Sequence, residues 1–148
     1  MPEPIALGQP PTNDAPGIPL ERERRPSAPW EGLPSEPGQP AIVNLTAAGA
    51  ALLAQARADA RGKATLPVLK GERQRALLVA LTAGAGLAEH ASPPAASLHV
   101  LSGCFRLSSA DHEWVCGPAE LVAIPPERHA VDCLEDGVFL LTVTPPGV

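Results

Sequence analysis

The sequence predicts an all-β sandwich or barrel, preceded by one helix and a proline-rich N-terminal segment. Short apolar runs recur from about residue 65 onward, with turn-forming residues at roughly the 8–12-residue spacing typical of such folds. One alanine-rich stretch with helix-capping residues comes before them. In addition, 11 of the 19 prolines lie within the first 40 of the 148 residues.

Residues 1–40 are predicted to be a disordered tail. They contain no periodic apolar run, so they cannot bury enough surface to offset the conformational entropy that ordering would cost. Their proline content favours locally extended polyproline II conformations. The folded domain is therefore expected to cover residues 41–148.

A helix is predicted over about residues 46–61, within "NLTAAGAALLAQARADARG". Asn44 or Thr46 can cap its start, and alanine favours its interior. Gly62 suits the left-handed conformation that often follows a helix. Because the apolar face is small, the helix is expected on the outside of the domain.

The barrel is predicted over about residues 65–145, where two segments look like hairpin turns. They are "SSADHE" and "LEDGV", of which Asp136-Gly137 is the stronger turn signal. Proline pairs mark loops because proline cannot donate to a strand ladder. The predicted strands are "TLPVL", "RALLVALTA", "LAEH", "SLHVL", "CFRLS", "HEWVC", "AELVAI", "HAVDC" and "VFLLTV", and the proline pairs are Pro93-Pro94 and Pro125-Pro126.

Charge and cysteine usage narrow the possible partners and location. The net charge is −5 with no basic stripe, which argues against nucleic-acid binding. No apolar run approaches the length of a membrane span, and no secretory signal is evident. The three cysteines are widely spaced and form no CxxC motif. These features predict a cytoplasmic protein with reduced thiols and no membrane partner.

Two histidines stand out by position: His90 ends a predicted strand before one proline loop, and His129 begins a strand after the other. Around them the chain resembles the cupin family. The first cupin motif reads Gly, five residues, His, one residue, His, three or four residues, Glu, six residues, Gly. The same spacing here connects Gly84, His90, Ser92, Ala96 and Gly103, and "VLSG" is similar to the usual "VLEG" ending.

The second cupin motif reads Gly, five residues, Pro, one residue, Gly, two residues, His, three residues, Asn. Ala119, Pro125, Glu127 and His129 follow this order, with one residue fewer before the histidine. The resemblance covers about residues 65–144. It implies a double-stranded β-helix, the jelly-roll barrel of cupins, in which both histidines reach one opening.

The departures from the family pattern concern metal binding. Metal-binding cupins use two His and one Glu from the first motif and one His from the second, whereas Ser92 and Ala96 occupy two of these positions here. A stable divalent site needs about three good protein ligands. We therefore expect no cofactor or, alternatively, a weakly bound Zn, Fe, Mn or Ni ion on His90 and His129.

Other side chains could supply additional ligands. Cys133 shares strand parity with His129, so it is expected to face the ligand pocket together with His90 and Ser92. His99 alternates with two apolar neighbours and is expected to point outward. Glu89 precedes a histidine and faces away from it, and His112 is expected at an exposed hairpin tip.

The favoured function is a non-enzymatic module that binds or senses a small molecule. The alternative is a metal-dependent cupin enzyme of the dioxygenase or isomerase type, using His90 and His129. A zinc-binding regulator that docks on a transcription partner is a third possibility, although no DNA-binding helix pair accompanies the barrel. The resemblance also implies a homodimer, and exposed barrel edges favour such pairing.

Overall fold

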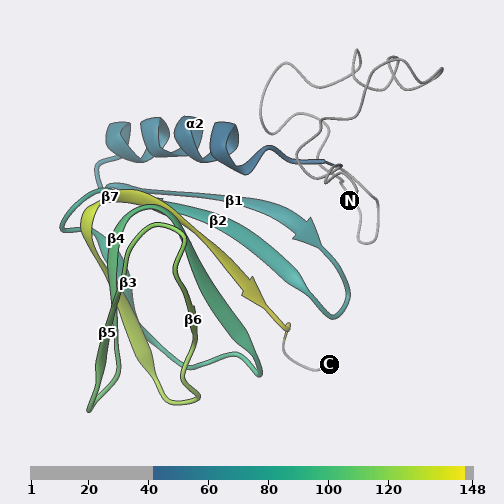
Figure 1. Cartoon of the computed structure of the whole chain (residues 1–148), viewed down its shortest axis with the longest axis vertical. Helices are drawn as coiled ribbons and strands as arrows, with labels where there is room; N and C mark the ends of the chain where they lie inside the picture. The colour runs from purple at the N-terminus through teal and green to yellow at the C-terminus, as the bar shows by residue number, and fades with distance from the viewer. Residues whose placement is uncertain (1–41, 146–148) are drawn as a thin grey trace, which may run out of the picture.

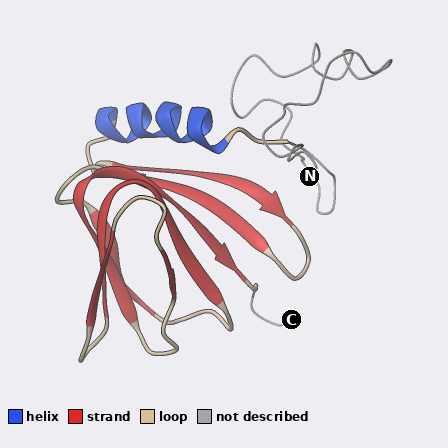
Figure 2. Ribbon diagram, in the orientation of Figure 1, coloured by secondary structure: helices blue, strands red, loops and turns tan. Residues whose placement is uncertain are grey.

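The computed structural model describes residues 42–145 as one helix and seven strands (Figures 1 and 2). The predicted N-terminal tail lies outside the described residues. The elements are α2 (Leu45–Ala58), β1 (Lys63–Lys70), β2 (Arg75–Leu81), β3 (Gly86–His90), β4 (Ala96–Ser108), β5 (Glu113–Cys116), β6 (Leu121–Ala123) and β7 (His129–Val143).

Helix α2 begins one residue before the predicted start and ends three residues early. The Asn44 side chain accepts a hydrogen bond of 2.9 Å from the backbone N–H of Ala47, as expected of an N-cap. The C-cap is Asp59 in an extended conformation. Gly62 does adopt the left-handed conformation, at φ +70°, but in the turn that connects the helix to β1.

All strand pairs are antiparallel, and two long strands organise the fold. Strands β4 and β7 pair along most of their length. Beyond them, β1, β2 and β6 extend one half of the sheet, and β3 and β5 extend the other half. The β4–β7 ribbon bends so that the two halves face each other, which makes the barrel visible in Figure 1. This architecture confirms the predicted jelly-roll barrel with one helix.

The predicted hairpin at "LEDGV" is wrong, because β7 runs through Asp136-Gly137 without reversing. Opposite it, β4 runs through Gly103, so "SLHVL" and "CFRLS" form one strand, as do "HAVDC" and "VFLLTV". The pairing register shifts around Gly103, which has φ +81°. A Cβ added to Gly137 would lie 2.6 Å from the Gly103 Cα. The two glycines therefore allow both strands to bend at one point.

The Asp136 side chain stabilises this bend. One carboxylate oxygen accepts a 2.7 Å hydrogen bond from the backbone N–H of Ala83, and the other accepts a 3.0 Å bond from Nε of Arg57. Both contacts lower the pKa of Asp136, and the hydrogen bond from the Ala83 N–H has the larger effect. The residue connects the bend to the end of α2 rather than forming a turn.

Other sequence predictions are confirmed. "SSADHE" connects β4 to β5, with the Ser109 N–H donating to the His112 carbonyl oxygen at 2.9 Å. Both proline pairs lie in loops, before β4 and before β7. Pro67 lies in β1, which is an edge strand and so tolerates a missing donor.

Two apolar clusters stabilise the domain. One fills the barrel between the two halves of the sheet, where Phe105 and Phe139 meet edge to face with centroids 4.9 Å apart. The other lies under α2, whose residues Ala48, Leu52 and Ala56 recur every four positions and pack on the outer surface of β2 and β7. The helix therefore covers the outside of the barrel, as predicted.

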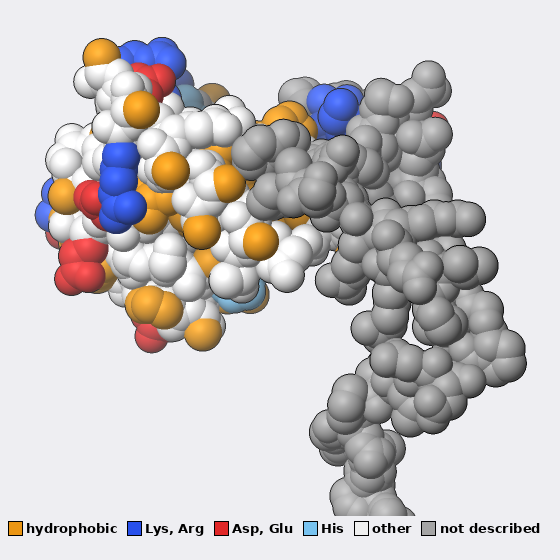
Figure 3. Space-filling view, turned by 90° about the horizontal axis from the view of Figure 1, so that it is seen from above, with side chains coloured by type: hydrophobic (Ala, Val, Ile, Leu, Met, Phe, Trp, Pro, Cys, Tyr) orange, Lys and Arg blue, Asp and Glu red, His pale blue; other side chains and the backbone are white. Residues whose placement is uncertain are grey.

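Figure 3, seen from above, shows apolar side chains scattered over this face, with basic and acidic groups among them. Within residues 42–145, no helix combines the length and apolarity needed to cross a bilayer.

Candidate functional site

The first feature of the candidate site is a contact between His90 and His129. They are register partners at the end of β3 and the start of β7, and their rings meet edge to face with centroids 4.4 Å apart. His129 is only 3% exposed, whereas His90 is exposed. The pair thus has one imidazole packed into the barrel and one at its surface.

Backbone carbonyls orient both rings. Nδ1 of His90 lies 2.8 Å from the Ala88 carbonyl oxygen, and Nδ1 of His129 lies 3.1 Å from that of Glu127. A carbonyl oxygen can only accept, so Nδ1 carries the hydrogen in each ring. When the imidazoles are neutral, both Nε2 atoms are therefore free to accept a hydrogen bond or bind a cation.

A salt bridge lies beside the pair. Nε of Arg128 is 3.6 Å from a Glu89 carboxylate oxygen, and the Arg128 guanidinium also donates to the Glu89 carbonyl oxygen at 3.4 Å. Both side chains are exposed, so we expect this ion pair to contribute at most about 1 kcal/mol. Its main effect is to connect the end of β3 to the segment that leads into His129.

The other predicted pocket residues lie near this strand pair in different environments. Ser92 is partly buried in the loop after β3, and its hydroxyl donates to the Pro93 carbonyl oxygen at 3.2 Å. Cys133 is 3% exposed and belongs to the interior cluster. Its thiol contacts the carbonyl oxygens of Leu81 and Glu135, and burial raises its pKa to about 11.

Ala96 and His99 are the other two positions at which a metal ligand could stand. Ala96, at the missing glutamate position, begins β4 and pairs with Val143. His99 pairs with Leu140, which belongs to the cluster outside the barrel, so His99 faces outward as predicted. Among residues 42–145, no three His, Cys, Asp or Glu side chains are grouped as a metal site requires.

Ser109, which the sequence places only in a predicted hairpin turn, lies beside the histidine pair. Its Oγ is the one side-chain nitrogen or oxygen in the described part of the chain that is buried without a hydrogen-bond partner. Ser108 pairs with Ala130, so extending the register of β4 and β7 by one residue places Ser109 opposite His129. Period-two alternation from the inward-facing Leu107 predicts this orientation.

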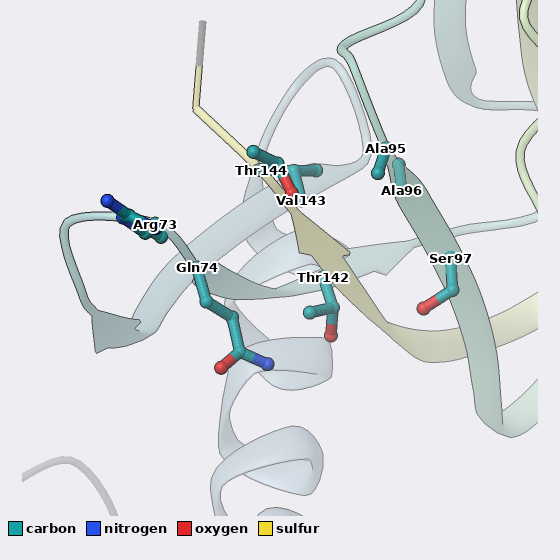
Figure 4. Close-up of a pocket in the computed structure, with 8 residues that line it drawn as sticks. All are labelled: Arg73, Gln74, Ala95, Ala96, Ser97, Thr142, Val143 and Thr144. Carbon is teal, nitrogen blue, oxygen red and sulfur yellow. The ribbon is translucent and has the colours of Figure 1, made fainter. Parts of the chain in front are cut away.

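A shallow cavity of about 420 Å³ lies elsewhere, over the ends of β2, β7 and β4 (Figure 4). The polar side chains of Gln74, Ser97 and Thr142 surround it on three neighbouring segments. None of its lining residues is a histidine. We base the candidate site on the histidine pair, because titratable, oriented groups are what binding or chemistry requires, whereas this cavity is open to solvent.

The barrel belongs to the jelly-roll class of β-barrels. Two of its histidines, His90 and His129, lie in contact at the edge of one half of the sheet. No protein-family model matches the sequence, and no curated protein matches it. Solved structures do match: a conserved protein of unknown function from Streptococcus pyogenes has a TM-score of 0.55 and 19% identity, covering 61% of this chain and 80% of that one.

Two further matches have cupin names. A cupin superfamily protein from Desulfitobacterium hafniense has a TM-score of 0.53 and 14% identity, covering 56% of this chain and 77% of its own. An RmlC-like cupin from Shewanella frigidimarina has a TM-score of 0.52 and 19% identity, covering 57% of this chain and 78% of its own. The chain is therefore a small protein with the cupin fold, as the motifs predicted. Sequence identities this low support a shared architecture and do not indicate a shared activity.

Proposed function

We propose that this protein is a non-enzymatic cupin-fold module that binds or senses a small polar ligand at His90 and His129. The observation that carries the proposal is the 4.4 Å contact between two imidazoles whose Nδ1 atoms are both engaged by backbone carbonyls. Rings held in this way present two free Nε2 atoms at one barrel edge. Such preorganised polar groups next to an apolar interior are typical of ligand sites.

In this proposal Ser92 lines the edge of the pocket, and Cys133 forms part of its apolar floor. Ser92 follows His90 by two residues, and Cys133 lies on the same side of β7 as His129. Because the Cys133 thiol is buried and already hydrogen-bonded, it contributes packing rather than a reactive group.

The experiment is a small-molecule screen read by the histidine-ring NMR signals. We expect hits to shift the His90 and His129 signals and to lose binding in the H90A/H129A double variant. H99A is the matched control, because His99 is on the outer face and its removal should leave binding unchanged. Hits that bind the double variant as well as the wild type would place the pocket elsewhere.

The alternative is a metal-dependent enzyme. The two free Nε2 atoms also support it, because a neutral imidazole nitrogen can bind a metal ion. The two ring centroids lie 4.4 Å apart, but two imidazole ligands make only a weak metal site. Elemental analysis of protein purified without chelator or a histidine tag distinguishes the functions. Stoichiometric metal that is lost in H90A/H129A would overturn the metal-free binding module in favour of a metal-dependent function, whereas the binding module predicts metal well below stoichiometry.

The homodimer and cytoplasmic location expected from the sequence stay predictions. Light scattering of the purified protein tests the first, and fractionation of the source cells tests the second.

A further inference from the structure

The cavity in Figure 4 lies at the opposite end of β7 from the histidine pair. Its volume of about 420 Å³ is within the range typical of small-molecule sites. His129 begins β7, whereas Thr142 and Val143, near the other end of the strand, line the cavity. A ligand bound here would therefore not contact the histidine pair.

The cavity lies over the outer surface of the sheet. Thr142 follows Leu140 by two residues, and Leu140 packs against the cluster under α2, so both side chains belong to the outer face. Ser97 on β4 and Ala76 on β2 are the register partners of Thr142. Figure 4 shows the Gln74 side chain pointing to the same side as that of Thr142. Polar groups from three neighbouring segments therefore share this face.

The polar groups around the cavity are donors of hydrogen bonds. Its uncharged donors are the amide of Gln74 and the hydroxyl groups of Ser97, Thr142 and Thr144. Among the described residues that line it, Arg73 carries a positive charge and none is acidic. A cavity with one cation, several neutral donors and no carboxylate favours a negatively charged ligand.

Arg73 lies at the rim of this cavity, in the tight turn that connects β1 to β2. The Gly71 N–H donates to the Gln74 carbonyl oxygen at 2.8 Å, which closes the turn. The Arg73 side chain is exposed and extends away from the other lining groups in Figure 4. It takes part in no ion pair among residues 42–145. The guanidinium can therefore rotate over the cavity when an anion is present.

We infer that this cavity is a second binding site and that it takes a small organic carboxylate. A guanidinium group forms two parallel hydrogen bonds to a planar carboxylate, and one arginine matches one negative charge. The neighbouring hydroxyl groups donate to the same anion, and the apolar part of the ligand contacts Ala95, Ala96 and Val143. Because the cavity is open to solvent, water screens the ion pair, so we expect weak binding in the millimolar range.

Benzoate is the probe, and benzamide is its matched control, because benzamide has the same ring and a similar shape but no charge. We expect benzoate to shift the backbone amide signals of Ser97 and Thr142 in NMR titrations of the full chain at constant ionic strength. Benzamide should shift them far less. Absence of a benzoate shift at these residues up to its solubility limit, or an equal shift with benzamide, would overturn the inference.

The variants R73Q and R75Q separate binding at the cavity from general attraction of an anion. Each removes one positive charge from an exposed position, but Arg75 does not line the cavity. We expect R73Q to weaken benzoate binding about tenfold or more, the effect of losing a charge-assisted hydrogen bond. R75Q should weaken it by no more than about twofold, because salt screens charges outside the site. Equal losses in the two variants would overturn the site.

The ring signals of His90 and His129 in the same titrations distinguish this inference from the proposed function. We expect benzoate to leave both ring signals in place. If benzoate shifts the histidine rings and not the cavity residues, the second site fails and the anion binds at the histidine pair. If benzoate shifts neither group while screened molecules still shift the histidine rings, the second site fails and the proposed function stands.

Discussion

His90 and His129 are 39 residues apart in the sequence, yet their rings touch edge to face at the barrel edge, with centroids 4.4 Å apart. The contact exists because β3 pairs with the first residues of β7, so that the last residue of one strand is opposite the first residue of the other. One ring is buried and its neighbour is exposed. The two histidines should therefore differ in what they contribute to stability.

We expect H129A to destabilise the fold by about 1–3 kcal/mol, because it removes a buried ring and leaves the Glu127 carbonyl without its donor. H90A should change the free energy of unfolding by no more than about 0.5 kcal/mol, the usual range for exposed side chains. Urea titration monitored by circular dichroism measures both. Equal losses in the two variants would contradict the buried placement of His129.

The bend at Gly137 is expected to depend on the lack of a side chain. In G137A the new Cβ would overlap the Ser102 carbonyl oxygen, so β4 and β7 would have to separate. We predict a loss of about 2–4 kcal/mol in the free energy of unfolding. G117A is the control, since a Cβ there meets only the end of the Glu120 side chain at 3.8 Å. A G137A protein as stable as G117A would refute the close approach.

Asp136 should make stability depend on acid pH. Its pKa is lowered, first by the Ala83 N–H and then by Arg57. A lowered pKa in the folded state means that the ionised carboxylate stabilises the fold fully above pH 3.8, its ordinary pKa. This contribution is lost as the pH falls below that value. D136N should thus be less stable than wild type at neutral pH, and the difference should shrink in acid.

Thermal unfolding measured from pH 7 down through pH 3.8 checks the prediction for Asp136. D132N is the control, because the Asp132 side chain, which pairs with Arg106 at 3.3 Å, is 50% exposed, whereas that of Asp136 is 34% exposed. If the stability difference between wild type and D136N stayed constant across this pH range, ionisation of the Asp136 carboxyl group would not stabilise the fold.

Cys133 should have the opposite pH dependence. Burial raises its pKa to about 11, with Asp136 adding a smaller effect. Its neutral thiol stabilises the fold fully below pH 9.0, and this contribution is lost as the pH rises toward about 11. C133A should therefore lose less stability than wild type over this alkaline range. At neutral pH we expect iodoacetamide to modify Cys133 far more slowly than the partly exposed Cys104.

Much of the architecture could be predicted from local chemistry. Apolar runs with period two marked the strands, and Pro93-Pro94 and Pro125-Pro126 marked loops because proline cannot donate to a ladder. These loops also placed His90 and His129 at strand ends, and the cupin motif spacing predicted that the two rings would meet. The histidine pair was therefore accessible from the sequence.

Two features depended on partners distant in the chain. Asp136-Gly137 has strong local turn propensity, but the ladder between β4 and β7, together with the Arg57 and Ala83 contacts, keeps the strand continuous. Ser109 looked like an ordinary turn residue, and its burial opposite His129 follows from the pairing of β4 with β7. Local side-chain preferences thus set the strands and loops, whereas long-range backbone pairing set the bend and brought Ser109 beside His129, because only pairing brings residues from separate strands together.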